Sequence, residues 1–197
     1  MKVIMKTRVA IVIFLLAALT LALTGCVVTS IYPFYFEKDV AFDSALLGDW
    51  TKANERWTFE RAGETAYRLT YAEGEKSSVM QAHLFELRGQ KFLDLFGPEP
   101  GDYGLLPPIP AHVLLRVVKT GPTLEMVPLD YEWLANLLEK KPKIIRHHIV
   151  KVNGDKRLVL TADTAELQRF VRKHLKTEDA WKEVLKLQPD QAGSTRR

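Results

Sequence analysis

The most chemically specific residues of this chain are Leu23-Thr24-Gly25-Cys26, which close an uncharged apolar run. In this order Leu23 fits an apolar pocket of a signal peptidase, Gly25 lets that enzyme approach the backbone, and the Cys26 thiol accepts a diacylglycerol. Cleavage before Cys26 makes it the lipidated first residue of the mature chain. Because Cys26 is the only cysteine, we expect no disulfide, thiolate nucleophile or cysteine-based zinc site.

The segment before Cys26 has the three parts of an export signal: a basic start, an apolar stretch and small residues at the cleavage site. We therefore predict a lipoprotein signal peptide over residues 1–25 and membrane lipid as a partner through acylated Cys26. The alternative is an uncleaved anchor, because Val27 and Val28 extend the apolar run toward the roughly 20 residues of a spanning helix. Residue 27 is not the aspartate that retains lipoproteins in inner membranes. The predicted location is the bacterial cell envelope, with the periplasmic side of the outer membrane favoured in a Gram-negative host.

Histidines and carboxylates give weaker signals. Neighbouring residues of a strand point to opposite faces, so His147 and His148 cannot bind one metal together, and the other histidines lie on separate elements. The chain has no Gly-x-Ser-x-Gly elbow, phosphate-binding loop or dinucleotide fingerprint. We therefore predict no catalytic residues, no metal and no cofactor.

An envelope hydrolase is the alternative function. It would use His112 with carboxylates in or beside a loop rich in glycine and proline, over residues 97–110. The candidate carboxylates are Asp94, Glu99 and Asp102. This hypothesis requires His112 to lie within hydrogen-bonding reach of Asp94 or Asp102.

Composition narrows the class of protein further. The formal net charge is +4 over 197 residues. It falls to +1 when the three basic residues of the predicted signal are removed. The mature chain therefore lacks the basic excess of a nucleic-acid-binding protein, and we predict no nucleic-acid partner. A chain of this length can fold as one domain around an apolar core.

The elements that must position these residues are mainly strands. From Leu46 onward apolar and polar residues alternate with the period of two that indicates half-buried strands, and short turns containing glycine separate the runs. The pattern predicts an antiparallel meander, with strands near residues 56–60, 67–71, 79–87, 91–96, 111–119, 123–128, 144–152 and 157–161. Arg88-Gly89-Gln90 is predicted as a three-residue hairpin, and Asn153-Gly154 as a two-residue hairpin.

Two helices interrupt and follow the strands. Asp130 is a candidate N-cap for an amphipathic helix that ends before Pro142. Asp163, with Glu166 three residues later, predicts a second helix opened by a capping box. A shorter amphipathic piece carries Trp181, and residues 188–197 are polar.

Leu46-Leu47-Gly48-Asp49-Trp50 contains a Gly-x-Trp at the first strand, which resembles the start of lipocalin and lipocalin-like barrels. The mature chain also resembles a family of uncharacterised bacterial lipoproteins. That resemblance rests on Tyr-Pro near the anchor, Gly-Asp-Trp, Ile109-Pro110-Ala111-His112 and Glu166-Leu167 in a terminal helix. The strand and helix pattern predicts a mainly β (α+β) fold, an antiparallel meander or barrel with an inserted helix and C-terminal helices, and the Gly-x-Trp resemblance implies that it is lipocalin-like. The sequence leaves an open sheet and a closed barrel as alternatives.

Five aromatic residues project from the early strands: Trp50, Trp57, Phe59, Tyr67 and Tyr71. In a hollow barrel they would line a pocket for a small apolar ligand. In a barrel filled by side chains they are core.

We thus predict a signal peptide over 1–25, a lipidated tether over 26–43, one β domain over 44–187 and a disordered tail over 188–197. The leading hypothesis is a membrane-anchored lipoprotein, not an enzyme, that binds a small apolar ligand or an envelope partner. A structural module that forms complexes through an exposed aromatic patch is a further alternative.

Overall fold

The computed structural model describes residues 27–98, 111–152 and 155–190. The predicted signal peptide, Cys26, Glu99 and Asp102 of the loop rich in glycine and proline, the Asn153-Gly154 turn and residues 191–197 lie outside the described residues. The strands are β1 (Thr29–Ser30), β2 (Val40–Ala41), β3 (Gly48–Lys52), β4 (Glu55–Ala62), β5 (Ala66–Glu73), β6 (Lys76–Leu87), β7 (Gln90–Pro98), β8 (His112–Lys119), β9 (Leu124–Pro128), β10 (His147–Val152), β11 (Asp155–Leu160) and β12 (Leu185–Pro189). The helices are α2 (Tyr131–Lys140) and α3 (Thr164–His174), with 3-10 turns η1 (Glu37–Asp39), η2 (Ser44–Leu46) and η3 (Glu178–Trp181).

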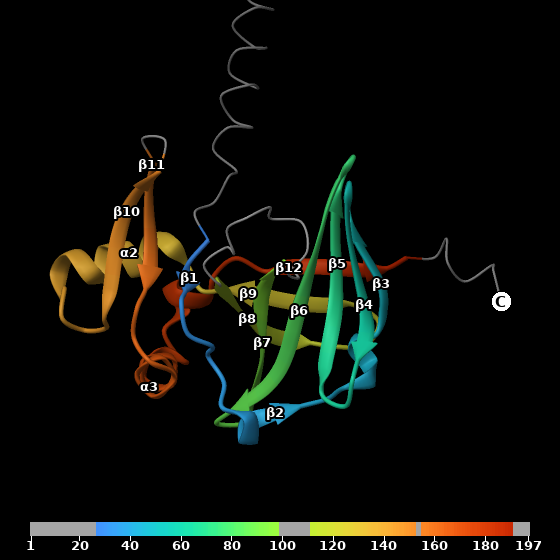
Figure 1. Cartoon of the computed structure of the whole chain (residues 1–197), viewed down its shortest axis with the longest axis horizontal. Coiled ribbons are helices and arrows are strands. Elements are labelled where there is room, and N and C mark those ends of the chain that lie inside the picture. The colour runs from blue at the N-terminus through green and yellow to red at the C-terminus, as the bar shows by residue number, and fades with distance from the viewer. Residues whose placement is uncertain (1–26, 99–110, 153–154, 191–197) are drawn as a thin grey trace, which may run out of the picture.

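Eight strands form a closed antiparallel barrel. Strands β3 to β8 are joined in chain order, β9 pairs with β8, and β12 pairs with both β9 and β3 to complete the ring (Figure 1). The mainly β fold and the barrel expected from the lipocalin resemblance are therefore confirmed, and the choice between an open sheet and a closed barrel is decided for the closed one.

The barrel follows from the alternation of side chains along each strand. In β7, Leu93 and Leu95 point into the barrel, and Phe92 and Asp94 point outward. The β6–β7 connection differs from the predicted three-residue hairpin. Leu87 pairs directly with Gln90, and both Arg88 and Gly89 have positive φ, which is the geometry of a two-residue type I′ turn.

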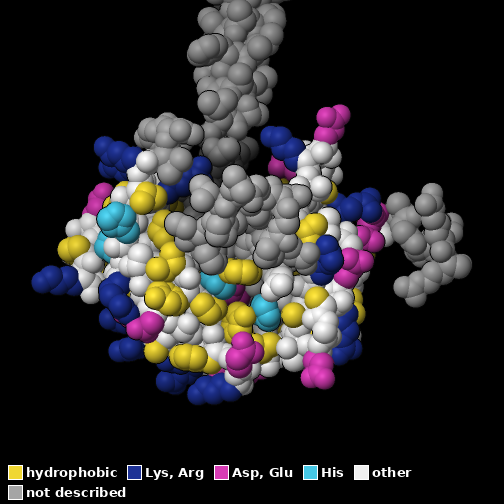
Figure 2. Space-filling view, viewed as in Figure 1, with side chains coloured by type: hydrophobic (Ala, Val, Ile, Leu, Met, Phe, Trp, Pro, Cys, Tyr) yellow, Lys and Arg dark blue, Asp and Glu magenta, His cyan; other side chains and the backbone are white. Residues whose placement is uncertain are grey.

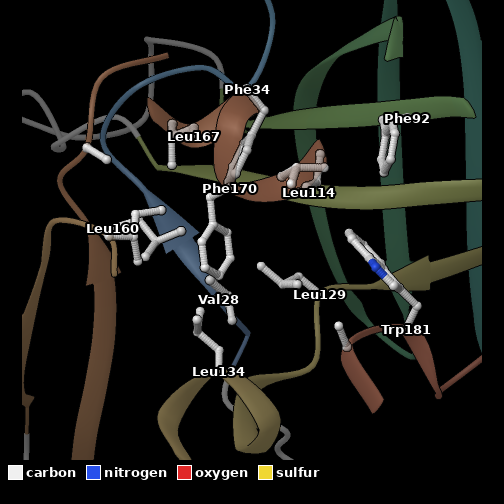
Figure 3. Packing of buried hydrophobic residues seen from close by; sticks show 14 of the residues in the cluster. Val28, Phe34, Phe92, Leu114, Leu129, Leu134, Leu160, Leu167, Phe170 and Trp181 are labelled. Carbon is white, nitrogen blue, oxygen red and sulfur yellow. The ribbon is translucent and has the colours of Figure 1, made fainter. Parts of the chain in front are cut away.

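A second layer packs against the outer wall of the barrel. Strand β1 pairs with the start of β8 and, in parallel, with β11, so that β10 and β11 extend the sheet away from the barrel. Helices α2 and α3 cover this extension (Figure 1). The side chains between them form a core separate from the barrel interior, which includes Val28, Phe34, Phe92, Leu134, Leu160, Leu167 and Phe170 (Figure 3).

Both predicted helix caps are present. Asp130 accepts a hydrogen bond from the Trp133 amide at 2.7 Å, and Asp163 accepts one from the Glu166 amide at 2.9 Å. The Glu166 side chain, however, bonds Arg146. The sequence therefore identifies the start of α3 correctly, but the Glu166 carboxylate of the predicted capping box binds another strand.

The ends of the domain differ from the predicted boundaries. Residues 27–43 are built into the fold, because Val28 and Phe34 are buried and β1 lies within the sheet. At the other end, the predicted short amphipathic piece divides into η3 and β12. Strand β12 includes Gln188 and Pro189, which pair with Thr51 and Trp50 of β3, so the domain extends into the predicted tail.

Candidate functional site

The aromatic residues proposed to bind a ligand pack together inside the barrel. Trp57 meets Tyr71 edge-on at 5.2 Å between ring centroids, and Phe59 meets Tyr67 edge-on at 6.2 Å. All of them except Tyr71 are buried members of the barrel core. A barrel interior filled by side chains is common at this size. This packing supports the interpretation of these aromatic side chains as core, and a ligand-binding role for them stays a prediction.

The polar atoms of these aromatics are also bonded within the protein. The Trp50 indole N–H donates to the Leu46 carbonyl at 2.9 Å. The Tyr67 hydroxyl accepts from the Asp43 amide at 2.6 Å and donates to the Asp43 carbonyl at 3.1 Å. Because these groups have protein partners, they do not offer a free donor or acceptor to a bound molecule.

The chemically distinctive residues lie on the outer wall of the barrel. Asp94 is fully buried, and its Oδ1 lies 2.6 Å from His112 Nδ1 on the neighbouring strand β8. Its Oδ2 accepts a hydrogen bond from the Phe34 amide at 2.8 Å. An ionised carboxylate is only an acceptor, so this geometry assigns a hydrogen to His112 Nδ1. The structure thus brings together Asp94 and His112, the pair that the hydrolase hypothesis requires.

Aromatic rings lie against His112 and against the neighbouring His83. Phe96 lies 4.6 Å from the His112 ring, and Tyr35 stacks on His83 at 4.7 Å between centroids. His83 is the register partner of Asp94 on β6. Figure 2 shows histidine side chains surrounded by hydrophobic ones near the middle of one face. The arrangement is an oriented imidazole beside a second histidine, on a largely apolar surface.

Ser30 adds a hydroxyl beside His112. The two residues face each other in the β1–β8 pair, which places their side chains on the same side of the sheet. Serine, histidine and aspartate are the residue types of a hydrolytic triad. The Ser30 hydroxyl is fully buried, however, and accepts a hydrogen bond from the Tyr32 amide at 3.2 Å. The arrangement can hold a proton at His112 Nδ1, and it offers no exposed nucleophile among these three residues.

Tyr35 keeps its proton at every physiological pH. Burial, with the nearby charges of Asp94 and Glu37, raises the pKa of the Tyr35 phenol to about 12. Its ring therefore acts as a neutral apolar surface over His83.

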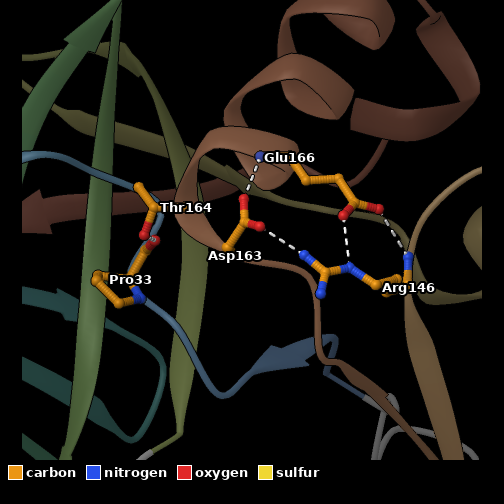
Figure 4. A network of polar contacts seen from close by, with 5 residues as sticks. All are labelled: Pro33, Arg146, Asp163, Thr164 and Glu166. Atoms are coloured by element: carbon orange, nitrogen blue, oxygen red, sulfur yellow. Dashed lines mark hydrogen bonds and ion pairs between the residues drawn. The ribbon is translucent and has the colours of Figure 1, made fainter.

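Helix α3 fixes the N-terminal segment over the pair. The Thr164 hydroxyl donates to the Pro33 carbonyl at 2.8 Å, and the Gln168 amide group donates to the Phe34 carbonyl at 3.1 Å. Arg146 holds the first turn of α3 through Asp163 and Glu166 (Figure 4). The segment that covers Asp94 is therefore attached to both the barrel and the helix.

Sequence reasoning missed three members of this site: Phe34 as the second partner of Asp94, Tyr35 over His83, and Ser30 beside His112. One signal was present. Asp94 is a lone carboxylate within the apolar run Phe92-Leu93-Asp94-Leu95-Phe96, and a buried carboxylate requires partners. The candidates Glu99 and Asp102 lie outside the described residues, and His174 does not join the site. His174 contacts Trp133 and Phe170 at the end of α3.

In comparisons with protein families, with curated proteins and with solved structures, no match to this chain is found. Membership of a family of bacterial lipoproteins therefore stays a prediction. Within the described ranges, no three His, Cys, Asp or Glu side chains are placed to hold a metal ion. In the same ranges no helix has the length and apolar character to cross a membrane.

The His83 environment predicts acid sensitivity. Burial lowers the pKa of His83, although the charges of Asp94 and Glu37 oppose that shift, and the buried Nδ1 has no partner within the described residues. The unfolded chain therefore takes up a proton at higher pH than the folded one. His83 favours folding fully above its unfolded pKa near 6.5, and this contribution is lost as the pH falls toward the folded pKa.

We expect His83→Phe, which preserves the ring stacked on Tyr35, to lose less stability than the wild type as the pH falls. The slope of the free energy of unfolding with pH should decrease by less than the slope that one bound proton gives. Urea unfolding between pH 7.5 and pH 5 measures this effect. Burial also lowers the pKa of His174. The matched variant His174→Phe therefore measures how much of the remaining pH dependence of stability comes from that histidine. An unchanged pH profile in His83→Phe would show that His83 titrates alike in the folded and unfolded chains.

Proposed function

We propose that this chain is a lipid-anchored bacterial envelope protein whose domain binds an envelope partner through aromatic residues of its N-terminal segment. These residues, Tyr32, Tyr35 and Phe36, are named here the N-terminal aromatic surface. The proposal combines the export and lipidation motif ending at Cys26 with the shape of the domain that follows it.

The exposure of two of these aromatics carries the proposal. Tyr32 is 46% exposed and Phe36 is 39% exposed, on a segment that Asp94 and α3 hold in place. Large aromatic side chains that are exposed on a fixed backbone lose little conformational freedom on binding, and they are enriched at protein interfaces. Because side chains pack together inside the barrel, the outer wall is a better candidate for binding than the interior.

The position of β1 supports attachment close to a membrane. Strand β1 begins at Thr29, and Val28 is already buried in the core. An acyl chain on Cys26 therefore leaves almost no free linker between the bilayer and the domain. Such an anchor confines the protein near envelope partners and raises their effective concentration.

Photo-crosslinking in the host tests the proposal. A photoreactive amino acid at position 32 or 36 of the full chain is expected to give one defined protein adduct, because these side chains lie at the interface. The matched control is position 60, where the exposed Glu60 lies on β4. The same cells receive an alkyne fatty acid, which is expected to label the wild type and not Cys26→Ser.

The two arms separate the parts of the proposal. Absence of label in the wild type contradicts the lipid anchor, whatever the crosslinking gives. Equal adducts at positions 32, 36 and 60, or none, contradict the N-terminal aromatic surface. A stoichiometric apolar molecule found by native mass spectrometry of the purified chain would instead favour the small-ligand hypothesis.

A second candidate function is an envelope hydrolase. The specific observation that favours it is the 2.6 Å contact between His112 and a fully buried Asp94, which orients an imidazole as catalytic dyads do. If the protein is such a hydrolase, the wild type hydrolyses an ester or amide, and the rate of that hydrolysis falls at least about 100-fold in His112→Gln. Hydrolysis that is absent from the wild type, or unchanged in the variant, rules this candidate out.

A further inference from the structure

A cationic groove lies between α3 and the barrel, away from the His112 site. Its volume is about 710 Å³, within the range of small-molecule sites. Two basic residues come from the barrel and four from α3 or the residues after it: Arg88, Arg116, Arg169, Arg172, Lys173 and Lys176. No carboxylate lines it, and none of these six side chains forms an ion pair within the part of the chain that the structure describes.

The helix alone does not account for this cluster. Basic residues in the last turn of a helix interact favourably with its dipole, which explains Arg172 and Lys173 at the end of α3. Arg88 and Arg116 belong to the β6–β7 turn and to β8. Two separate parts of the fold therefore place cations against the same groove.

Arg88 stands at a position that disfavours it. Its φ is +55°, in the left-handed region, where glycine and asparagine are better tolerated than a long side chain. The turn would form more readily with asparagine, so the backbone gives no reason for arginine there. Such strain is typical of positions held for function.

Arg116 is oriented and incompletely bonded. Its guanidinium donates to the Leu175 carbonyl at 3.2 Å and to Gln90 Oε1 at 2.5 Å. The buried Nε of Arg116 has no partner within the described residues. That nitrogen is closed off from solvent, but the two contacts use only two of the five guanidinium N–H donors, so Gln90 and the end of α3 fix a guanidinium with further terminal N–H groups at the wall of the groove.

We propose that this groove binds a small soluble anion carrying at least two phosphate groups. Four of the six cations are arginines, whose planar guanidinium forks match phosphate oxygens. A single phosphate carries about −1.5 to −2 charges at pH 7, which leaves most of the six cations unbalanced, and a second phosphate reduces that excess.

The position of the groove favours a soluble ligand over a phospholipid headgroup. In Figure 1 the first described residues lie above β1, whereas α3 and the β6–β7 turn lie toward the lower edge. Lys and Arg side chains gather along that lower edge in Figure 2. If Cys26 carries the proposed anchor, the groove faces away from the membrane that holds it.

Calorimetric titration of the full chain in neutral detergent with inorganic pyrophosphate tests the inference. We expect saturable binding that weakens at least about tenfold in Arg88→Asn/Lys173→Gln, because two charge-assisted contacts are lost. Asparagine suits the left-handed turn, and the loss of Lys173 from the last turn of α3 removes only one favourable interaction with the helix dipole, so the thermal midpoint of the variant is expected to fall by a few degrees at most. The matched control is Lys52→Gln/Lys151→Gln, which removes two exposed lysines near strand ends that do not line the groove and should leave binding unchanged.

Several outcomes would overturn the proposal: no saturable binding, equal weakening in the control, or equal affinity for a DNA oligomer. Binding to phosphatidylglycerol vesicles that pyrophosphate does not displace would assign the groove to a lipid surface instead. The titration needs neither lipidation nor a protein partner, so its result is separate from that of the proposed function.

Discussion

Replacing Asp94 by alanine is expected to lower the free energy of unfolding by about 2–6 kcal/mol, because two buried donors, the Phe34 amide and His112 Nδ1–H, lose their acceptor at about 1–3 kcal/mol each. Asp94 is fully buried, and each of its two oxygens has a partner. The variant leaves the Phe34 amide without an acceptor, and a buried unsatisfied donor costs about 1–3 kcal/mol. It also removes the acceptor that fixes the His112 ring, so both neighbours of Asp94 are affected.

The urea midpoint at pH 7 measures this loss, and two further variants interpret it. Asp94→Asn keeps an oxygen that can accept from Phe34 and is expected to lose less than the alanine variant. Asp49→Ala removes a partly exposed carboxylate that accepts from the Thr58 hydroxyl at 2.5 Å, and it should cost about 1 kcal/mol. If Asp94→Ala is no worse than Asp49→Ala, the buried pair does not hold the N-terminal segment to the barrel.

The fold was largely predictable because short stretches of sequence mark most of its strands, turns and helix starts. The alternation along β4 to β8 marks which side chains face inward, and glycine-containing turns mark where the chain reverses. Asp130 and Asp163 identify the starts of both helices from single residues. Closure of the barrel depends on a pairing between β12 and β3, far apart in the sequence, which no local pattern expresses.

Strand β12 also lacks a strong signal of its own. Only Leu185 and Leu187 alternate in it, and Pro189 ends it. Its neighbours Trp181 and Val184 have a helical spacing with these leucines, so an amphipathic helix fits the same residues. A short strand becomes identifiable only when the edges of β3 and β9 are known to need a partner.

The candidate site was predicted in part for a similar reason. The sequence indicated His112 and a nearby carboxylate as a conditional pair, and the register of β7 and β8 satisfies that condition. The cover supplied by Phe34 and Tyr35 could not be predicted, because these residues precede the barrel strands and the pattern indicated a tether. Buried Val28 shows instead that the second core begins almost at the predicted lipidation site.

A chain that ends at residue 184 is expected not to form the native barrel. Truncation there removes Leu187, which is fully buried in the barrel core, and the truncation of such a leucine to alanine alone costs about 2–5 kcal/mol. It also removes the backbone pairing of β12 with β3 and β9, which leaves two unpaired strand edges. Together these losses approach the whole stability of a domain, about 5–15 kcal/mol.

The matched control ends at residue 190. It keeps β12, the Asp190 amide bond to the Asp49 carbonyl at 2.9 Å and the 2.8 Å ion pair between Arg56 and Asp190. We expect a cooperative unfolding transition and the near-ultraviolet circular dichroism of packed tryptophans in the control, and neither in the shorter chain. Leu187→Ala in the full chain should lie between them. A native-like transition in the shorter chain would contradict this prediction, because it would show that the barrel stays folded without its closing strand. Trp50 on β3 would then remain buried although its β12 partner Pro189 is absent.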